Sequence, residues 1–372
     1  MSTMLNSQAA ILVQANTPFV TDIIQVAPPA PGEVLVEIAA SGLCHTDLTA
    51  VEGSNASCVY PAVLGHEGAG RVVEVGREVK GFRVGDHVVP LFGPECGVCK
   101  MCRSNRTNLC WSIKPTRDRG VMPDGTSRFR WQGSTLHHFM GTSTFSRYTV
   151  VPEIALAKIR PDAPLDRVCL LGCGVTTGVG AALHDVREGD NVLVFGLGGI
   201  GVNIVQGARI AGARQIIGVD FQPAKAALAG RLGMTHFIDA KAGAARVREE
   251  ALSLTEGGAD VAFECTGKIE VMRQALDACH VGWGTCVLLG VEPKGAEMPV
   301  PPVAVRYGRT VKGSYFGGVK GRSGLSRFVD LYMDGQLEID ALITHRLSLA
   351  DINKGFELMV TGESLRSVVL ME

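Results

Sequence analysis

Four cysteines lie within one short stretch of the chain with the spacing of a metal site. Cys96, Cys99, Cys102 and Cys110 include two CxxC gaps, so their thiolates can converge on one ion. Four sulfur ligands leave no open position, which indicates a structural zinc. Free thiols, a redox CxxC pair and an iron–sulfur cluster are the alternatives. A redox pair would not need the third and fourth cysteines, and nothing else in the sequence suggests electron transfer.

A second set of metal-binding residue types is spread more widely. Cys44 and His66 offer the sulfur and nitrogen ligands that zinc accepts, and Cys173 follows in a glycine-rich turn. Two cysteines and one histidine, with water in the fourth position, form a catalytic zinc pattern. Asp47 could hold the second ring nitrogen of His66 and thereby fix its tautomer. Taken singly, Cys44 is more often a buried apolar residue and His66 a hydrogen-bonded turn histidine.

A glycine loop offers a different chemistry, the binding of a pyrophosphate. A run of apolar residues ends in a GxGxxG motif, and a helix-like pattern starts at once. The loop residues are Gly196, Leu197, Gly198, Gly199, Ile200 and Gly201. Asp220 follows ~20 residues later, where an acid accepts both ribose hydroxyls of an adenosine, so we expect NAD rather than NADP. The alternative is a strand-to-helix turn that binds nothing.

Length and charge limit what these motifs can belong to. A chain of 372 residues is too long for one ordinary core, so we expect about two domains. The formal net charge is -1 with no run of like charges, which argues against nucleic acid or an anionic membrane as a partner. No window of ~18 uninterrupted apolar residues exists, and the N-terminus lacks a secretion signal. We expect a cytoplasmic protein whose eleven cysteines are thiols or metal ligands.

The elements that must position these residues change character along the chain. Residues 1–90 alternate apolar and polar side chains between turns, as in a small all-β unit. Residues 111–147 are expected to form a long functional loop or lid. From 191 onward strand-like runs alternate with helical ones, which predicts a doubly wound parallel sheet. Its strands are expected at 191–196, 215–220, 235–238, 260–265, 285–291 and 310–315. Two amphipathic helices (323–335 and 350–361) and a strand (367–371) would return to the first domain.

The combination of motifs resembles the zinc-dependent medium-chain alcohol dehydrogenases. Within that family it is most similar to the class III branch, the glutathione-dependent formaldehyde dehydrogenases. The segments that carry the resemblance are 42–47, 64–70, 96–110, 122–129, 140–145, 168–174, 195–201, 218–220 and 352–359. The resemblance implies an α/β chain with a GroES-like β-rich catalytic domain (1–177 and 319–372) and a Rossmann NAD-binding domain (178–318). It also implies a homodimer formed through an edge strand near 300–317.

The resemblance further implies roles for single residues, and two zinc ions per chain. The catalytic zinc would be held by Cys44, His66 and Cys173, with Glu67 behind the metal as an acid that can become a transient ligand. The structural zinc would be held by Cys96, Cys99, Cys102 and Cys110. Cofactor contacts would come from His45 and Arg366 (pyrophosphate), Asp220 and Lys225 (ribose), Thr177 (nicotinamide) and the loop Gly196–Gly201. The zinc would lower the pKa of an alcohol whose proton passes to Thr46 before hydride moves to NAD.

The chain departs from the class III pattern around the substrate. Thr49 replaces a usual tyrosine, or the histidine that completes a proton relay in some relatives. Lys114 stands where that branch presents an arginine, and Asn55 and Ser57 stand where it presents acids. Lysine keeps the charge but loses the bidentate fork that suits a carboxylate. The substrate-pocket positions are all apolar: Phe92, Phe139 and Met140.

These departures favour a hydrophobic or aromatic primary alcohol or aldehyde as the substrate. Three alternatives remain. The enzyme could be an S-(hydroxymethyl)glutathione dehydrogenase, or a nicotinoprotein that keeps its NAD bound. A non-catalytic protein with a borrowed fold would be expected to have lost Cys44, His66 or Cys173, and all three are present.

Overall fold

The structure is a computed structural model that describes residues 4–371 of the chain. The first three residues, to which the expectation of no secretion signal also refers, lie outside this range. The chain divides into two compact units, Met1–Cys173 with Lys320–Glu372, and Gly174–Val319. The first division lies four residues before the expected boundary, because helix α5 (Gly174–Asp185) is continuous and takes Gly174–Thr177 into the second unit.

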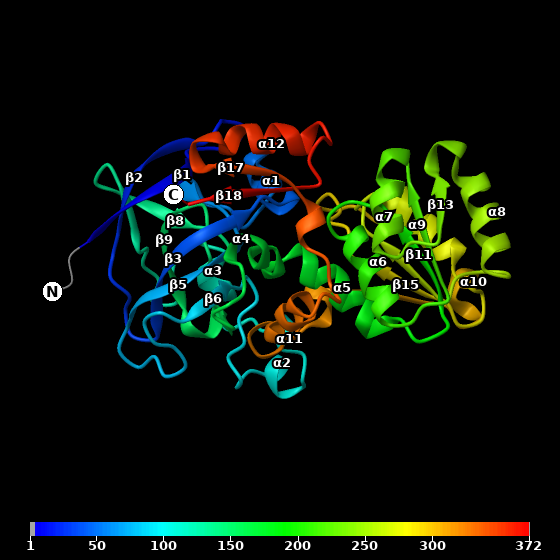
Figure 1. Ribbon diagram of the computed structural model, residues 1–372, viewed down its shortest axis with the longest axis horizontal. Helices are drawn as coiled ribbons and strands as arrows, with labels where there is room; N and C mark the ends of the chain where they lie inside the picture. The colour runs from blue at the N-terminus through cyan, green and yellow to red at the C-terminus, as the bar shows by residue number, and fades with distance from the viewer. Residues whose placement is uncertain (1–3, 372) are drawn as a thin grey trace. The chain divides into compact units, whose positions relative to one another are not determined.

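The first unit consists of a small closed barrel and a larger sheet (Figure 1). The barrel order is β1-β2-β7-β8-β4, with β1 Leu5–Leu12, β2 Val20–Val26, β4 Ala62–Val63, β7 Phe129–Trp131 and β8 Ser134–His138. The sheet order is β10-β6-β5-β3-β18-β17, with β9 paired to β3; the bounds are β3 Glu33–Gly42, β5 Glu67–Val75, β6 His87–Pro90, β9 Tyr148–Pro152, β10 Leu156–Ile159, β17 Ile343–Ser348 and β18 Arg366–Leu370. The helices are α1 His45–Val51, α2 Lys100–Arg103, α3 Lys114–Arg117, α4 Leu165–Val168, α11 Gly321–Met333 and α12 Ile352–Val360.

Strand β3 is the centre of this unit. It pairs antiparallel with β5 along most of its length, with β9 at its start and with β18 at its end. The alternation in 32–39 predicted a half-buried strand, but eight of the ten β3 residues are buried, and these include the charged Glu33. Glu33 tolerates burial because the Arg128 guanidinium donates two hydrogen bonds to its carboxylate.

The prediction of one long loop over 111–147 was wrong. This stretch contains α3 and a hairpin in which β7 pairs antiparallel with β8, joined at Trp131↔Ser134. The two turn residues, Gln132 and Gly133, both have positive φ (49° and 80°), as a tight hairpin turn of this hand requires. Gln-Gly is a weaker turn signature than Asn-Gly, and the short strands carry little alternation, so the sequence pattern did not reveal the hairpin.

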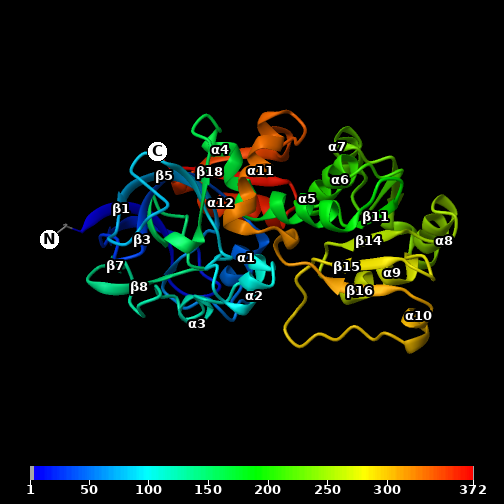
Figure 2. The same cartoon turned by 90° about the horizontal axis from the view of Figure 1, so that it is seen from below.

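The second unit is a six-stranded sheet in the order β13-β12-β11-β14-β15-β16, with every neighbouring pair parallel. Figure 2 shows β11, β14, β15 and β16 side by side. The strands are β11 Asn191–Phe195, β12 Gln215–Asp220, β13 His236–Asp239, β14 Val261–Glu264, β15 Thr285–Leu288 and β16 Thr310–Gly313. The other helices are α6 Gly201–Ile210, α7 Ala226–Leu232, α8 Ala244–Leu254, α9 Ile269–Ala278 and α10 Pro302–Arg306. The predicted doubly wound sheet is confirmed.

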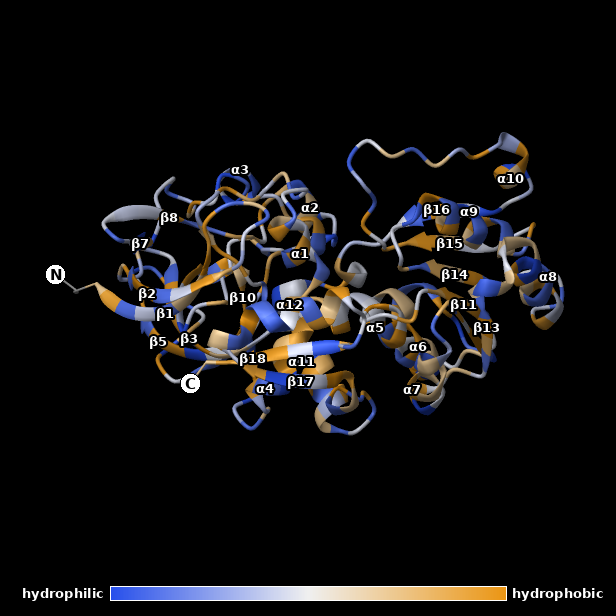
Figure 3. Cartoon of the chain, turned by 90° about the horizontal axis from the view of Figure 1, so that it is seen from above, coloured by the Kyte–Doolittle hydropathy of each residue, from blue (hydrophilic) through white to orange (hydrophobic). Residues whose placement is uncertain are grey.

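The central strands are apolar because helices cover the sheet. All five residues of β11 and all four of β14 are buried, and β14 and β15 are coloured as apolar in Figure 3. Helix α6 packs against α5 and α7, while α8 packs against α9. The parallel register places the ends of β11 and β12 at one edge, so Gly196 and Asp220 lie close together there.

Within residues 4–371, no single helix is long and apolar enough to cross a membrane. By length and composition alone, the broken pair Leu165–Gly172 and Gly174–Asp185 meets the criteria for a bent span.

Candidate functional site

Strand pairing brings the first group of metal-binding side chains together. Cys44 follows the end of β3, and His66 immediately precedes β5, whose first residue, Glu67, pairs with Gly42 of β3. Cys173 stands at the end of a short 3-10 turn, just before α5. One donor atom from each of Cys44, His66, Glu67 and Cys173 lies within 4.8 Å of the others. The structure therefore assembles the predicted catalytic set from three separate segments of the first unit.

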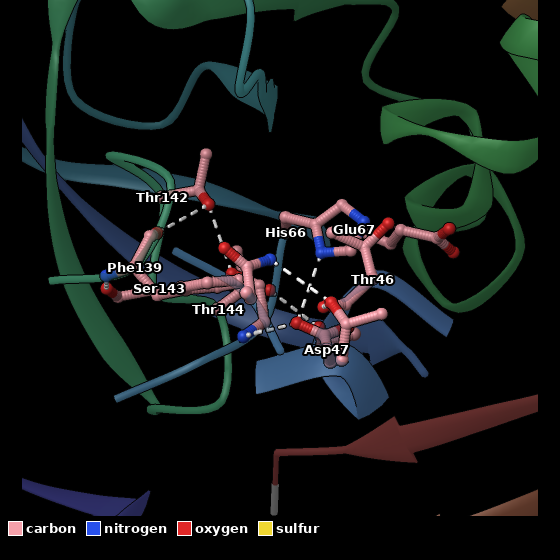
Figure 4. A network of polar contacts seen from close by, with 12 residues as sticks. Thr46, Asp47, His66, Glu67, Phe139, Thr142, Ser143 and Thr144 are labelled. Carbon is pink, nitrogen blue, oxygen red and sulfur yellow. Dashed lines mark hydrogen bonds and ion pairs between the residues drawn. The ribbon is translucent and has the colours of Figure 1, made fainter. Parts of the chain in front are cut away.

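His66 is oriented toward the centre of this group. Its Nδ1 lies 3.1 Å from Oδ1 of Asp47, and the same oxygen accepts the Gly65 backbone N–H at 3.1 Å (Figure 4). With Nδ1 as the donor, Nε2 keeps its lone pair. That Nε2 is fully buried and has no hydrogen-bond partner within the described chain. A buried ring nitrogen beside two cysteine sulfurs fits a zinc ion, which would satisfy it.

The charges around this group favour a cation. A hydrogen bond from the Cys173 thiol holds the pKa of Cys44 well below its ordinary value. Burial lowers the pKa of His66, but the charges of Asp47 and Cys44 outweigh this effect and raise it. Burial raises the pKa of Glu67 to about 8, against the opposing effect of Arg366. The site thus attracts positive charge, whether as a proton on His66 or as a metal ion among its donors.

The four-cysteine loop forms the second group, and its donors also lie within 4.8 Å of one another. The Sγ atoms of Cys96 and Cys102 are 3.9 Å apart, and those of Cys99 and Cys110 are 3.8 Å apart. The backbone N–H groups of Cys99 and Cys102 each donate at 3.4 Å to the sulfur three residues earlier. These N–H groups stabilise thiolates. All eleven cysteines are free thiols, so the four cysteines of this loop form no disulfide. Their clustered sulfur atoms fit a structural zinc.

Two of the three predicted substrate-pocket residues flank His66. The Phe92 ring centroid lies 5.9 Å from that of His66, and the Phe139 centroid lies 6.5 Å away, both edge to face. Met140 follows with a positive φ of 54°. Thr46 is half-buried on the first turn of α1, next to the exposed His45.

Arg366 is buried, and its Nη2 is paired with Oε2 of Glu67. Its expected contact with the cofactor pyrophosphate stays a prediction. Thr177 is buried in α5, in the second unit.

The glycine loop has the geometry that a dinucleotide requires. Gly196 has φ of 91°, and a side chain on Gly201 would overlap the Gly196 carbonyl oxygen, so helix α6 packs directly on the turn. A Cβ on Gly198 would meet nothing within 4 Å, which leaves open space beside the backbone for phosphates. Asp220 accepts the Leu197 backbone N–H at 2.7 Å and the Lys225 ammonium at 3.0 Å. These residues fit NAD.

Two features of this edge went unnoticed in the sequence. Glu264 is buried at the end of β14 and accepts the Thr266 and Gly267 backbone N–H groups at 2.6 and 3.1 Å. The Thr266 methyl group packs against Gly196, where a Cβ would approach it to 2.7 Å. Phe221, directly after Asp220, is exposed between the ammonium groups of Lys225 and Lys268. An aromatic residue directly after Asp220, the acid expected to bind the ribose, was the sequence signal that could have identified Phe221.

Comparison with known proteins decides the family. The model of the alcohol dehydrogenase GroES-like domain matches residues 30–162, and that of the zinc-binding dehydrogenases matches residues 199–332. An alcohol dehydrogenase class-3 from Cereibacter sphaeroides is 50% identical over 375 residues, covering 98% of this chain and 100% of the relative. The chain belongs to the zinc-dependent alcohol dehydrogenases, in their class III branch. The predicted family and fold are therefore confirmed.

Other relatives carry more information about this alcohol dehydrogenase. An S-(hydroxymethyl)glutathione dehydrogenase from Paracoccus denitrificans is also 50% identical, over 98% of the chain and 100% of the relative. A solved zinc-binding alcohol dehydrogenase domain protein from Burkholderia ambifaria has a TM-score of 0.94 and 34% identity, covering 100% of both chains. Benzyl alcohol dehydrogenase from Acinetobacter calcoaceticus has a TM-score of 0.92 and 28% identity, covering 99% of this chain and 100% of the other.

The protein is therefore a zinc- and NAD-dependent oxidoreductase that acts on small-molecule alcohols or aldehydes. The sequence-based preference for a hydrophobic alcohol needs correction, because the full-length relatives support the glutathione alternative better. That preference rested on four residues near the substrate that differ from the class III pattern. Over the whole chain, by contrast, 49–50% of the residues are identical to those of these relatives.

Proposed function

We propose that this enzyme oxidises S-(hydroxymethyl)glutathione with NAD. The support comes from relatives of that name which share 48–50% of residues with the chain from end to end. The chemistry rests on one observation, the cluster of Cys44, His66, Glu67 and Cys173 around the partnerless Nε2 of His66. In this proposal Cys44, His66 and Cys173 hold the catalytic zinc, and the four-cysteine loop holds the structural one.

In this proposal, residues of the first unit have separate roles in positioning the metal ligands, moving the proton and excluding water. Bound zinc supplies Lewis acidity that lowers the pKa of the alcohol, and NAD supplies the hydride acceptor. Asp47 fixes the His66 tautomer, and Arg366 holds the Glu67 carboxylate beside the metal ligands. The Thr46 hydroxyl, on the first turn of α1, would accept the alcohol proton while it releases its own proton to the next group of the relay. Phe92 and Phe139 present apolar rings edge to face with the His66 ring, which would help to exclude water from its surroundings.

The proton cannot leave Thr46 through the Thr49 side chain. The Thr49 hydroxyl donates to the Thr46 carbonyl oxygen at 2.8 Å and accepts a hydrogen bond from the Asn55 amide at 3.2 Å. Both roles are local: the Thr49 proton is committed to the Thr46 carbonyl oxygen, so this hydroxyl does not pass a proton onward. We infer that the relay continues through the cofactor ribose to His45, which is exposed, or to solvent.

The second unit binds the cofactor. We infer that Asp220 and Lys225 hold the adenosine ribose, and that the N–H groups of the loop Gly196–Gly201 and the start of α6 hold the pyrophosphate. The carboxylate of Asp220 repels a 2′-phosphate, which favours NAD over NADP.

A hydrophobic primary alcohol is the second candidate substrate, and local contacts favour it. Lys114 is already paired with Asp118, four residues along, so its charge is partly neutralised before any carboxylate arrives. The side-chain Oδ1 of Asn55 accepts the Ser57 backbone N–H at 3.0 Å, and its Nδ2 donates to the Thr49 hydroxyl. Both polar atoms of the Asn55 side chain are therefore already hydrogen-bonded within the loop. The similarity to benzyl alcohol dehydrogenase points in the same direction.

A substrate panel separates the two candidates. Initial rates of NADH formation are measured with formaldehyde, with formaldehyde plus glutathione, and with benzyl and octyl alcohol. The proposal expects turnover of formaldehyde only when glutathione is added. Equal rates with and without glutathione, together with efficient oxidation of benzyl alcohol, would establish the second candidate. Assay of NAD(H) in the supernatant of denatured protein tests for a nicotinoprotein, which would release one equivalent per chain.

We also propose a homodimer formed through the edge of the second unit. Strand β16 is the last strand of the sheet, so one of its sides offers unpaired backbone groups. Exposed apolar side chains lie nearby in the sequence, among them Val303, Tyr307 and Tyr315. As expected from its prolines, the preceding segment forms α10 rather than strand. Light scattering that gives a monomer at micromolar concentration would contradict the dimer.

We propose a cytoplasmic location as well, because eleven free cysteines suit a reducing compartment. Fractionation of the native cells tests this location.

A further inference from the structure

A segment of the first unit that has no assigned role lies beside the metal-binding cluster. Thr142, Ser143 and Thr144 follow the substrate-facing Phe139 and Met140, and all three hydroxyl residues are completely buried. Figure 4 shows them in one polar network with Asp47 and His66. Buried hydroxyl groups are retained where they have specific partners, so their acceptors indicate what they do.

The Thr142 hydroxyl holds the peptide that precedes His66. It donates to the carbonyl oxygen of Gly65 at 3.0 Å, and that oxygen also accepts the Thr144 backbone N–H at 3.0 Å. On the opposite side, the N–H of Gly65 donates to Asp47, which also holds the His66 ring. The backbone before His66 is therefore fixed from both sides, by the Thr142 segment and by α1.

The same hydroxyl also reaches the wall of the substrate pocket. A second acceptor, the carbonyl oxygen of Phe139, lies 3.3 Å from Thr142 Oγ1, and the Phe139 ring contacts the His66 ring. Thr142 is itself held in place, because its N–H donates to Phe139 and its carbonyl accepts the Thr149 hydroxyl at 2.8 Å. One side chain thus connects a metal-binding residue with a substrate-facing one.

The close fit at Gly65 makes this contact rigid. Gly65 has φ of 91°, and a Cβ there would come within 2.7 Å of both the Phe145 backbone nitrogen and the Thr144 hydroxyl. The Thr142 segment therefore packs directly on the Gly65 backbone. A small movement of this segment must move the peptide of His66 with it.

We propose that Thr142 is a positioning residue: it sets the orientation of His66 toward zinc and couples that orientation to Phe139. The inference rests on the proposed function, in which His66 is a zinc ligand. Outer partners that orient a ligand typically change metal affinity by roughly 10–100-fold when they are removed. The isosteric Thr142→Val removes the hydroxyl, whereas Thr142→Ser keeps it.

A matched control exists in the second unit. Thr255 is also buried, and its hydroxyl donates to one backbone carbonyl, that of Ala251, at 2.6 Å. Thr255→Val therefore removes an equivalent hydrogen bond in the unit that contains neither group of metal-binding residues. Each variant is purified with its zinc. The measurements are the release of each zinc to a chelator, the visible spectrum after cobalt replaces the catalytic zinc, and the separate kcat and KM values.

For Thr142→Val we expect release of one of the two zincs roughly 10-fold faster or more, with the four-cysteine zinc unchanged. Its cobalt spectrum should shift and its kcat for alcohol should fall, while the KM for NAD stays the same. Thr142→Ser and Thr255→Val should resemble the wild type in all of these readouts.

Two results would overturn the inference. One is a Thr142→Val enzyme with wild-type zinc release and an unchanged cobalt spectrum. The other is that Thr142→Val and Thr255→Val both release both zincs faster, and to the same extent. That result would show that loss of a buried threonine hydroxyl destabilises the protein in general. A wild-type protein that binds only one zinc would instead refute the proposed function on which the inference depends.

Discussion

The backbone N–H of Leu197 donates to Oδ2 of Asp220 at 2.7 Å. This bond ties the acid at the end of β12 to the glycine loop that follows β11, in a sheet where the two strands run parallel. Asp220 is almost fully buried, and its other partners are the Gln222 N–H and the Lys225 ammonium. The carboxylate therefore has a structural partner, and in the proposed function its charge also selects the cofactor; these two roles can be separated by mutation.

Asp220→Asn should weaken the discrimination between NAD and NADP. Asparagine keeps an oxygen acceptor for Leu197 but removes the negative charge that repels a 2′-phosphate. We expect the ratio of kcat/KM for NAD over NADP to fall by roughly 10-fold, which corresponds to about 1.4 kcal/mol. The measurement uses one alcohol and both cofactors. An unchanged ratio would show that the charge of Asp220 does not select the cofactor.

Single cysteine variants should separate the two zinc sites. The wild type should contain two zincs per chain, one for each donor group. Cys44→Ser should lose one zinc and all activity, whereas Cys99→Ser should lose the other zinc and much of the thermal stability. Cys58→Ser is the control, because Cys58 is half-buried and belongs to neither group. Metal analysis that finds a single zinc in the wild type would refute this assignment.

Removal of Arg128 should destabilise the first unit strongly. Its Nε and Nη2 donate to the two oxygens of Glu33 at 2.7 Å each, and both side chains are at most 7% exposed. Arg128→Met leaves the Glu33 charge buried without its partner, at a cost of about 3–5 kcal/mol. The double variant Glu33→Leu/Arg128→Met should regain much of this loss. Urea unfolding followed by circular dichroism measures both, and a single-variant cost below about 1 kcal/mol would contradict the argument.

His138 should make the folded state less stable in mild acid. Burial, with help from the charge of Arg128, lowers its pKa to about 3, and its Nε2 accepts the Arg128 backbone N–H at 3.1 Å. The unfolded chain binds this proton near pH 6.5 and the folded chain does not, so the stability contribution is complete above that pH and is lost as pH falls toward 3. Between pH 7 and pH 5 the loss should be about 2 kcal/mol.

His138→Gln tests this pH dependence. Glutamine offers an oxygen acceptor in place of Nε2 but does not titrate. Its unfolding midpoint in urea should therefore fall less than that of the wild type between pH 7 and pH 5. Parallel curves for the two proteins would show that His138 titrates normally in the folded state.

Sequence alone was sufficient for the chemistry and for most of the architecture. Cysteine spacing, the glycine loop and Asp220 each depend on residues close together in the chain, and their meaning follows from residue type and order. The strands of the second unit were predicted within a few residues, because each has a strong apolar pattern and clear breaks. The hairpin at Trp131–Ser134 was missed because its strands are too short for a period to show.

Tertiary structure alone decided which distant side chains became partners. Glu67 and Arg366 are 299 residues apart, and they meet because β3 has β5 on one side and β18 on the other. Gly42 of β3 makes room for their ion pair, since a Cβ there would lie 2.5 Å from the Glu67 carboxylate and 3.2 Å from the Arg366 guanidinium. The bond from Thr142 to Gly65 likewise joins segments 77 residues apart. Residue types define what a site can do, but strand pairing and packing determine which residues reach it, and neither is encoded in local spacing.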